Sequence, residues 1–141
     1  MSTPDRPAPV AAWHAIAESR DPANLDALLA DDCTFRSPAV HRAQEGKALT
    51  TAYLAAAIVV LGPSLRYVEQ WWTEAADGGS AVLEFEAELD GRTVHGVDML
   101  RWNADGRLTS FTVMVRPIRG LESLIAAMGT ELMRSEAQSD Q

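Results

Sequence analysis

The second half of the sequence alternates between apolar and polar residues, which is the pattern of half-buried β-strands. Four stretches show this alternation: residues 65–73, 81–89, 94–102 and 108–115. Between them lie three segments typical of tight turns: Asp77-Gly78-Gly79, Asp90-Gly91 and Asn103-Ala104-Asp105-Gly106. The pattern therefore predicts a meander of long antiparallel strands.

The first half instead carries apolar residues at helical spacing. It predicts helices over residues 9–19 and 47–61, and between them a helix that begins at Asp21-Pro22 and ends near Asp31-Asp32. A short strand is expected over residues 33–36, and a last helix over residues 120–128. Residues 1–8 are expected to form a flexible arm and residues 130–141 a polar tail, so that one domain covers residues 9–129.

Helices followed by a meander predict an α+β fold, in which the N-terminal helices pack on one face of a curved antiparallel sheet. Such a sheet leaves a concave cavity, which is a usual place for a small ligand. The 141 residues suffice for one domain with a core of its own.

Composition and charge narrow the function classes. A net charge of −8 argues against binding to nucleic acid or to an anionic membrane, since both need basic patches. No apolar stretch approaches the roughly 20 residues of a membrane span, and the proline-rich N-terminus does not resemble a signal peptide. The lone Cys33 is expected to be a small core residue in a reducing compartment. A cytoplasmic protein is therefore expected.

Asp98 is the strongest candidate for a functional residue, because the alternation places it on the apolar face of its strand with Leu100 and Trp102. A carboxyl group on such a face is either paired or has its pKa raised by desolvation. It is then either an acid in a ligand site or a structural contact that holds the sheet together.

Three segments resemble the nuclear-transport-factor-2-like superfamily, a cone-shaped, cystatin-like α+β fold. They are Leu28-Leu29-Ala30-Asp31-Asp32-Cys33-Thr34-Phe35-Arg36-Ser37-Pro38, Glu45-Gly46, and Val97-Asp98-Met99-Leu100-Arg101-Trp102 with Asp105-Gly106-Arg107-Leu108. Ketosteroid isomerases, SnoaL-like polyketide cyclases and limonene epoxide hydrolases share this fold. The resemblance implies the architecture more strongly than any one activity, because the fold hosts unrelated chemistries and also proteins that are not enzymes.

The resemblance places Asp98 where ketosteroid isomerases have the carboxylic acid of their oxyanion hole, which stays neutral in an apolar site and donates a hydrogen bond. Trp13 falls at the tyrosine that shares this oxyanion hole, and Ser37 falls at the general-base aspartate. A supporting tyrosine falls at Leu54, next to Tyr53, and an aspartate of the epoxide hydrolases falls at Val113. The resemblance therefore implies neither named activity.

We expect an apolar cavity that binds a small hydrophobic, oxygen-bearing molecule without a cofactor or a metal. Its expected wall consists of Trp13, Tyr53, Phe85, Phe111, Val113 and Val115. If the chain is an enzyme, it would be an isomerase, cyclase or hydratase in which Asp98 donates a proton or a hydrogen bond and Ser37 or His41 positions substrate or water. The alternative is a non-catalytic interaction module with a filled cavity.

The opposite face of the predicted sheet suggests a partner surface. It combines apolar and charged side chains: Glu84, Glu86, Glu88, Val97, Met99, Arg101, Met114 and Arg116. Charged pairs around an apolar centre suit a homodimer that packs sheet against sheet. The alternative is an exposed sheet with cross-strand salt bridges.

Overall fold

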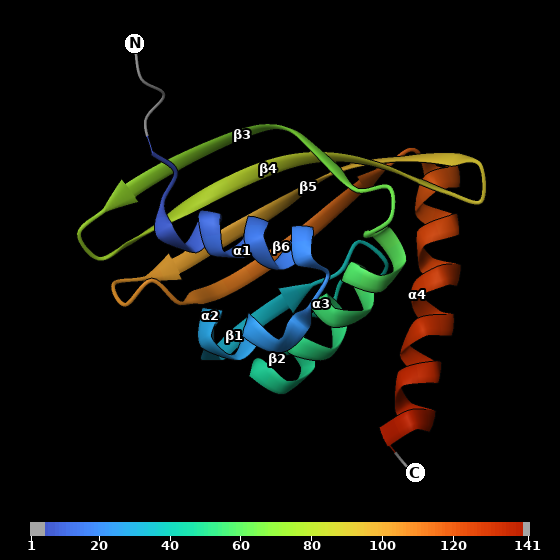
Figure 1. Ribbon diagram of the computed structural model, residues 1–141, viewed down its shortest axis with the longest axis horizontal. Coiled ribbons are helices and arrows are strands. Elements are labelled where there is room, and N and C mark those ends of the chain that lie inside the picture. Colours follow the sequence, from blue (N-terminus) through green and yellow to red (C-terminus); the bar gives the residue numbers. More distant parts are fainter. Residues whose placement is uncertain (1–4, 140–141) are drawn as a thin grey trace.

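The computed structural model describes residues 5–139. Its helices are α1 (Ala8–Ser19), the one-turn 3-10 helix η1 (Pro22–Asn24), α2 (Leu25–Leu28), α3 (Lys47–Leu61) and α4 (Ile118–Ser139). Its strands are β1 (Leu29–Arg36), β2 (Gln44–Glu45), β3 (Arg66–Ala75), β4 (Gly78–Leu89), β5 (Arg92–Asn103) and β6 (Leu108–Arg116). The predicted α+β class is confirmed (Figure 1).

The strands form one curved sheet in the order β2-β1-β6-β5-β4-β3. The expected antiparallel meander is present from β3 to β6, and β2 also pairs antiparallel with β1. The pairing of β1 with β6 is parallel, so the sheet is mixed rather than wholly antiparallel. This pairing joins the N-terminal half of the chain to the meander.

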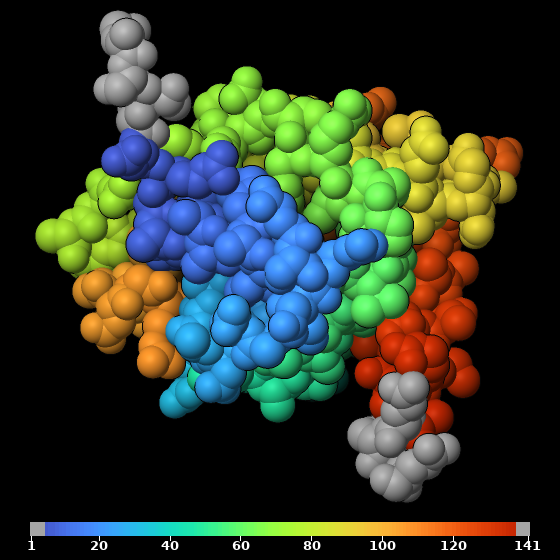
Figure 2. Space-filling model, viewed as in Figure 1, coloured from blue at the N-terminus to red at the C-terminus, as the bar shows by residue number. Residues whose placement is uncertain are grey.

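The helices lie on one side of the sheet. In Figure 1, α1 and α3 lie in front of it, and α4 stands along one end. Figure 2 shows these helices as a continuous layer, with α1 in blue, α3 in green and α4 in red. Side chains of α1 and α3 share one buried cluster with the inner face of the strands, and α4 adds Leu124 to a second cluster beside it.

Strand β5 shows why the alternation is so regular. Its even-numbered residues from Val94 to Trp102 are buried, and the residues between them are more exposed. Gly96 fits this buried row because an alanine Cβ there would come within 2.3 Å of the Met114 carbonyl oxygen and 2.8 Å of Phe85 Cζ. The absence of a side chain at Gly96 thus leaves room for the Phe85 ring.

The helix expected to end near Asp31-Asp32 is much shorter than predicted. The chain leaves α2 after Leu28, and β1 begins at Leu29 rather than at Cys33. Leu29 is fully buried and pairs with Leu108 of β6, so long-range strand pairing overrides the local helical spacing. Cys33 is buried in the core, as predicted.

The C-terminal helix is longer than predicted. Helix α4 continues past Met128 to Ser139, so the described part of the expected polar tail is helical. An ion pair between Arg134 and Glu131, one turn apart, supports this extension, with Arg134 Nε 2.9 Å from a carboxylate oxygen. Residues 1–4 of the expected arm, and residues 140–141 of the tail, lie outside the described residues.

The predicted boundaries of α3 are confirmed, and α1 begins one residue earlier than expected. Within residues 5–139, no helix combines the length and the apolar character that crossing a membrane requires.

Candidate functional site

A cavity of about 220 Å³ opens between the sheet and the helices. Helices α1, α3 and α4, the inner face of the sheet and the loop that follows β1 all contribute to its wall. The lining side chains are mostly apolar, and six of them are aromatic: Trp13, Phe35, Tyr53, Tyr67, Phe85 and Phe111. Asp98 is the one carboxyl group among them, and they include no Lys, Arg or His.

Asp98 belongs to a buried chain of three hydrogen-bonded side chains. The indole Nε1 of Trp13, on α1, donates to the Tyr67 hydroxyl oxygen at 2.8 Å. The Tyr67 hydroxyl, on β3, in turn donates to Asp98 Oδ2 on β5. Tyr67 thus accepts from one neighbour and donates to the other, which fixes the orientation of its proton.

Burial dominates the electrostatics of this chain. Asp98 is only 6% exposed, and desolvation raises the pKa of its carboxyl to about 7, although the hydrogen bond from Tyr67 works in the opposite direction. The pKa of Tyr67 is raised well above its usual range by burial and by the neighbouring Asp98 charge. Near neutral pH the Asp98 carboxyl can therefore both release and accept a proton.

The Tyr67 ring is held in place by further aromatic neighbours. His14 meets it edge-on at a centroid distance of 4.9 Å, and Phe85 does so at 6.3 Å. His14 Nε2 lies 2.8 Å from Gln70 Oε1 and donates to it, and burial lowers the pKa of this histidine. These contacts hold the Tyr67 hydroxyl where it can reach Asp98.

Seven of the predicted site residues lie in the cavity wall: Asp98, Ser37, Trp13, Tyr53, Phe85, Phe111 and Val113. Ser37 stands at the cavity edge, but its hydroxyl accepts from the backbone N–H groups of Ala39 and Val40 at 3.2 and 3.3 Å. Its observed contacts therefore shape the loop after β1. The roles of these residues in binding or catalysis stay predictions.

Two predicted site residues lie outside the wall. His41 is exposed in the loop after β1 and does not line the cavity. Val115 shares the inner face with Val113, but it packs against the neighbouring cluster that contains Leu61 and Val94. Val113 also packs against that cluster, but it lines the cavity as well.

Tyr67 is the hydrogen-bonding site residue that sequence reasoning missed, and the wall residues Phe35, Leu124, Met128 and Leu132 were not predicted either. Strand 65–73 contains three aromatic residues, and the alternation alone does not single out Tyr67 among them. A usable signal lies in the pairing, since Tyr67 lies opposite Phe85 and Phe85 lies opposite Gly96, two residues from Asp98. An apolar strand with a buried acid needs a donor close by, and Tyr67 is that donor.

Within residues 5–139, no group of three or more His, Cys, Asp or Glu side chains is placed to hold a metal ion.

A family model described as a SnoaL-like domain matches residues 10–111. Among solved structures, a steroid delta-isomerase from Pseudomonas aeruginosa is 34% identical with a TM-score of 0.80, and the match covers 98% of each chain. An uncharacterised bacterial protein with a cystatin-like fold, from Silicibacter pomeroyi, is 25% identical with a TM-score of 0.77, over 89% of this chain and 86% of that one.

An NTF2-like protein of unknown function from Mesorhizobium loti is 21% identical, with a TM-score of 0.61, over 82% of this chain and 98% of that one. At this identity the likeness concerns the fold alone. No curated protein matches the sequence.

Proposed function

The chain belongs to the SnoaL-like domain family, within the NTF2-like superfamily, and on that premise we propose that it is a cofactor-free isomerase acting on an apolar carbonyl compound. The observation that carries this proposal is the buried Tyr67–Asp98 pair in the wall of an apolar cavity. An apolar cavity with a few convergent polar groups is the usual form of a small-molecule site. The cavity is open rather than filled, which favours this function over a purely structural module.

The proposed chemistry moves one proton within the substrate. Ionised Asp98 takes a proton from the carbon next to the carbonyl, and the electron pair of that C–H bond forms an enolate. Asp98 then returns the same proton to a different carbon of the conjugated system, which shifts the double bond. A carboxyl whose pKa is about 7 suits both steps, since it neither holds nor releases the proton too strongly.

Tyr67 completes this proposal as the donor for the enolate. In the resting site its hydroxyl donates to the Asp98 carboxylate. Once Asp98 has taken the proton, its negative charge is gone, and the developing enolate oxygen becomes the better acceptor for that hydroxyl. The resemblance places Ser37 at the general base of ketosteroid isomerases, but a serine hydroxyl has no useful basicity, so we assign the proton transfer to Asp98.

The relative from Pseudomonas aeruginosa supports an isomerase, because it is a steroid delta-isomerase at 34% identity over 98% of both chains. Its substrate is not carried over to this chain.

The test is a direct assay with β,γ-unsaturated ketones containing one, two or four rings, in which the conjugated enone product is followed by its ultraviolet absorbance. We expect conversion of at least one ketone well above the buffer rate. Asp105→Asn, which alters an exposed carboxylate in the turn between β5 and β6 and outside the cavity wall, should retain this conversion. Failure of all the ketones to react, at several pH values from 6 to 9, would contradict the proposed function.

We also propose that the chain forms a homodimer through the outer face of the sheet. Five apolar side chains form a band across the strands: Trp71, Val82 and Met99 lie side by side in one row, and Val97 and Met114 do so in another. Trp71 is 55% exposed and Met114 is 54% exposed, although both lie on the regular part of the sheet. An exposed apolar band of this kind suits contact with a second copy.

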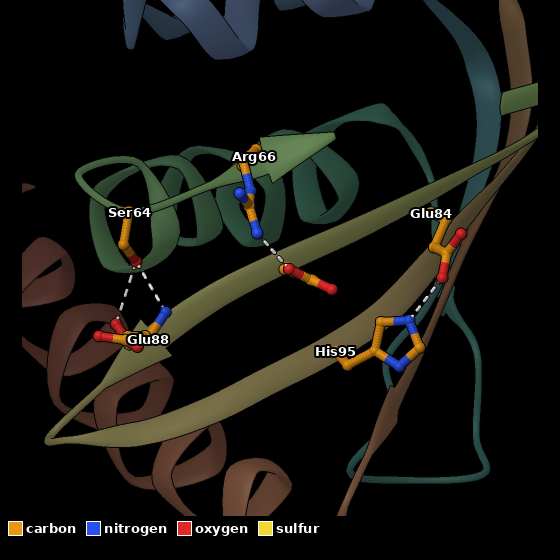
Figure 3. A network of polar contacts seen from close by, with 6 residues as sticks. Ser64, Arg66, Glu84, Glu88 and His95 are labelled. Atoms are coloured by element: carbon orange, nitrogen blue, oxygen red, sulfur yellow. Dashed lines mark hydrogen bonds and ion pairs between the residues drawn. The ribbon is translucent and has the colours of Figure 1, made fainter. Parts of the chain in front are cut away.

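Charged side chains border the apolar band. Figure 3 shows Glu84 and His95 pointing toward one another from β4 and β5, with His95 Nε2 2.7 Å from Glu84 Oε2. Arg116 donates to His95 Nδ1 at 3.1 Å, so the Nε2 atom carries the proton that is donated to Glu84. Arg66 pairs with Glu86 on the same face. This border can fix the register of two copies by charge complementarity.

For the dimer, we expect the wild type to sediment as a dimer at micromolar concentration and Met114→Glu to sediment as a monomer, since a carboxylate within the apolar band would lose its hydration in the interface. Met133→Glu is the matched control, because Met133 is 72% exposed on α4, away from the sheet. A monomeric wild type, or a Met114→Glu variant that still dimerises, would argue against this interface.

A further inference from the structure

We propose that the ligand is a compact, flat, uncharged compound of one or two rings, with a single oxygen at the Tyr67–Asp98 end and less bulk than a four-ring steroid. This inference rests on the proposed function and names its substrate class. It is carried by the size of the cavity, by the packing of its aromatic wall and by the absence of charge in its lining.

The volume of the cavity sets the first limit. Sites that enclose a drug-sized molecule usually measure about 300–1,000 Å³. This cavity measures about 220 Å³, which falls below that range. A one- or two-ring compound therefore fits inside, whereas a four-ring steroid would leave part of its apolar surface in water or would have to displace the wall.

The aromatic side chains of the wall are held in place by packing against one another. Trp13 packs edge-on against Phe111 at a centroid distance of 4.8 Å, and Phe35 stacks on Tyr53 at 5.3 Å. Phe35 and Phe111, at 6.1 Å, join these two pairs into one set. Because each ring supports the next and all but Tyr53 are buried, moving one of them would disturb the core. Flat ring faces also favour a flat ligand.

The charge of the lining residues also limits which ligands the cavity can bind. Apart from Asp98, no described residue in the wall carries a charge at neutral pH. A carboxylate or phosphate on the ligand would enter a dry site without a cationic partner, and ionised Asp98 would repel it. The oxygen of the ligand is therefore a carbonyl, enol or hydroxyl group that can reach Tyr67.

Helix α4 is the part of the wall that can be changed without breaking the aromatic set. Leu124, Met128 and Leu132 face the cavity at helical spacing, and Met133 on the same helix is exposed to solvent. Shortening Met128 should therefore enlarge the cavity from its α4 side. The same substitution at Met133 removes a similar side chain but leaves the cavity as it is.

The experiment measures equilibrium binding, by calorimetry, of a one-ring enone, a two-ring enone and a four-ring steroid enone, each with the wild type, Met128→Ala and Met133→Ala. A one-ring enone that carries a carboxylate serves as the charged probe. We expect the wild type to bind the steroid and the charged probe at least about tenfold more weakly than the two-ring enone. Met128→Ala should improve steroid binding about tenfold, and Met133→Ala should resemble the wild type.

The outcomes separate the two proposals. Steroid binding by the wild type that equals or exceeds binding of the two-ring enone overturns the size limit but leaves the proposed isomerase standing. Strong binding of the charged probe overturns the charge limit in the same way. Absence of binding by all the enones overturns both proposals. If Met128→Ala does not fold, Leu132→Ala enlarges the same wall one turn further along α4.

Discussion

Replacing Asp98 with asparagine is expected to abolish turnover and, at the same time, to make the folded protein more stable above pH 7. Turnover should fall by about 10²–10⁴-fold, because asparagine cannot carry the proton that the proposed reaction moves. Stability should rise because the amide needs no charge in the dry site, while its carbonyl oxygen still accepts from Tyr67.

The raised pKa of Asp98 determines how the free energy of unfolding of the wild type changes with pH. The pKa of Asp98 is about 7 in the folded protein, against an ordinary value of 3.8, so the folded state binds the proton more tightly than the unfolded chain does. The free energy of unfolding of the wild type therefore falls as pH rises from about 4 to about 7, and then levels off. The total contribution is on the order of 4 kcal/mol.

Thermal unfolding between pH 4 and pH 9 measures this difference. The extra amide N–H of Asp98→Asn offsets part of the gain, which leaves about 2 kcal/mol at pH 8, a rise in melting temperature of roughly 5 °C. Because the cost of the amide does not change with pH, the variant should be about 2 kcal/mol less stable than the wild type near pH 4, and the two stability curves should cross at about pH 5 to 6. Asp105→Asn controls for the loss of one exposed carboxylate. A variant that is less stable than the wild type at pH 8 would show that the Asp98 charge is stabilising rather than costly.

Tyr67→Phe is expected to lower kcat by about 10²–10³-fold, the usual effect of losing one donor to a developing oxyanion. It should also destabilise the fold by about 1–3 kcal/mol, since Trp13 Nε1 loses its acceptor and buried Asp98 loses its donor. The hydrogen bond from Tyr67 lowers the pKa of Asp98, so its removal raises that pKa further.

The pH–rate profile separates this role of Tyr67 from a purely structural one. Because the reaction needs ionised Asp98, the rate rises with pH through the pKa of that carboxyl, and the midpoint should lie at higher pH in Tyr67→Phe. Tyr53→Phe removes the other tyrosine hydroxyl from the cavity wall without touching Asp98, so its midpoint should stay where it is in the wild type. An unmoved midpoint in Tyr67→Phe would contradict the coupling between the two residues.

Local patterns were sufficient to predict most of the fold. The four meander strands follow from alternation and turn residues, because each neighbouring pair is joined by a short connection. The parallel pairing of β1 with β6 depends on contacts between distant segments, and so the early start of β1 at Leu29 was not visible in the local spacing. The extension of α4 beyond Met128 was missed because Gly129 and the polar residues around Leu132 and Met133 interrupt the apolar stripe, although Leu132 continues the spacing of Leu124 and Met128.

The candidate site was predictable where it depended on strand parity. Parity placed Asp98 and Phe85 on the inner face, and both line the cavity. It could not identify Tyr67, because a shift in register between Tyr67 and Glu69 changes which residues of β3 face inward. Nor could it separate Val113 from Val115, since both share the inner face and only the packing of the helices decides which of them lines the cavity.

The parallel pairing of β1 also bears on how the chain folds. Until β6 has been synthesised, β1 has only the two residues of β2 as a strand partner, and one edge of β1 stays open. The hydrogen bonds of the site are equally non-local, since Trp13 and Tyr67 are 54 positions apart and Tyr67 and Asp98 are 31 apart. Contacts of this kind form late and slow the folding of a domain. The nascent chain thus carries an exposed strand edge until β6 has been made, and Tyr67 and Asp98 come together only when the sheet is nearly complete.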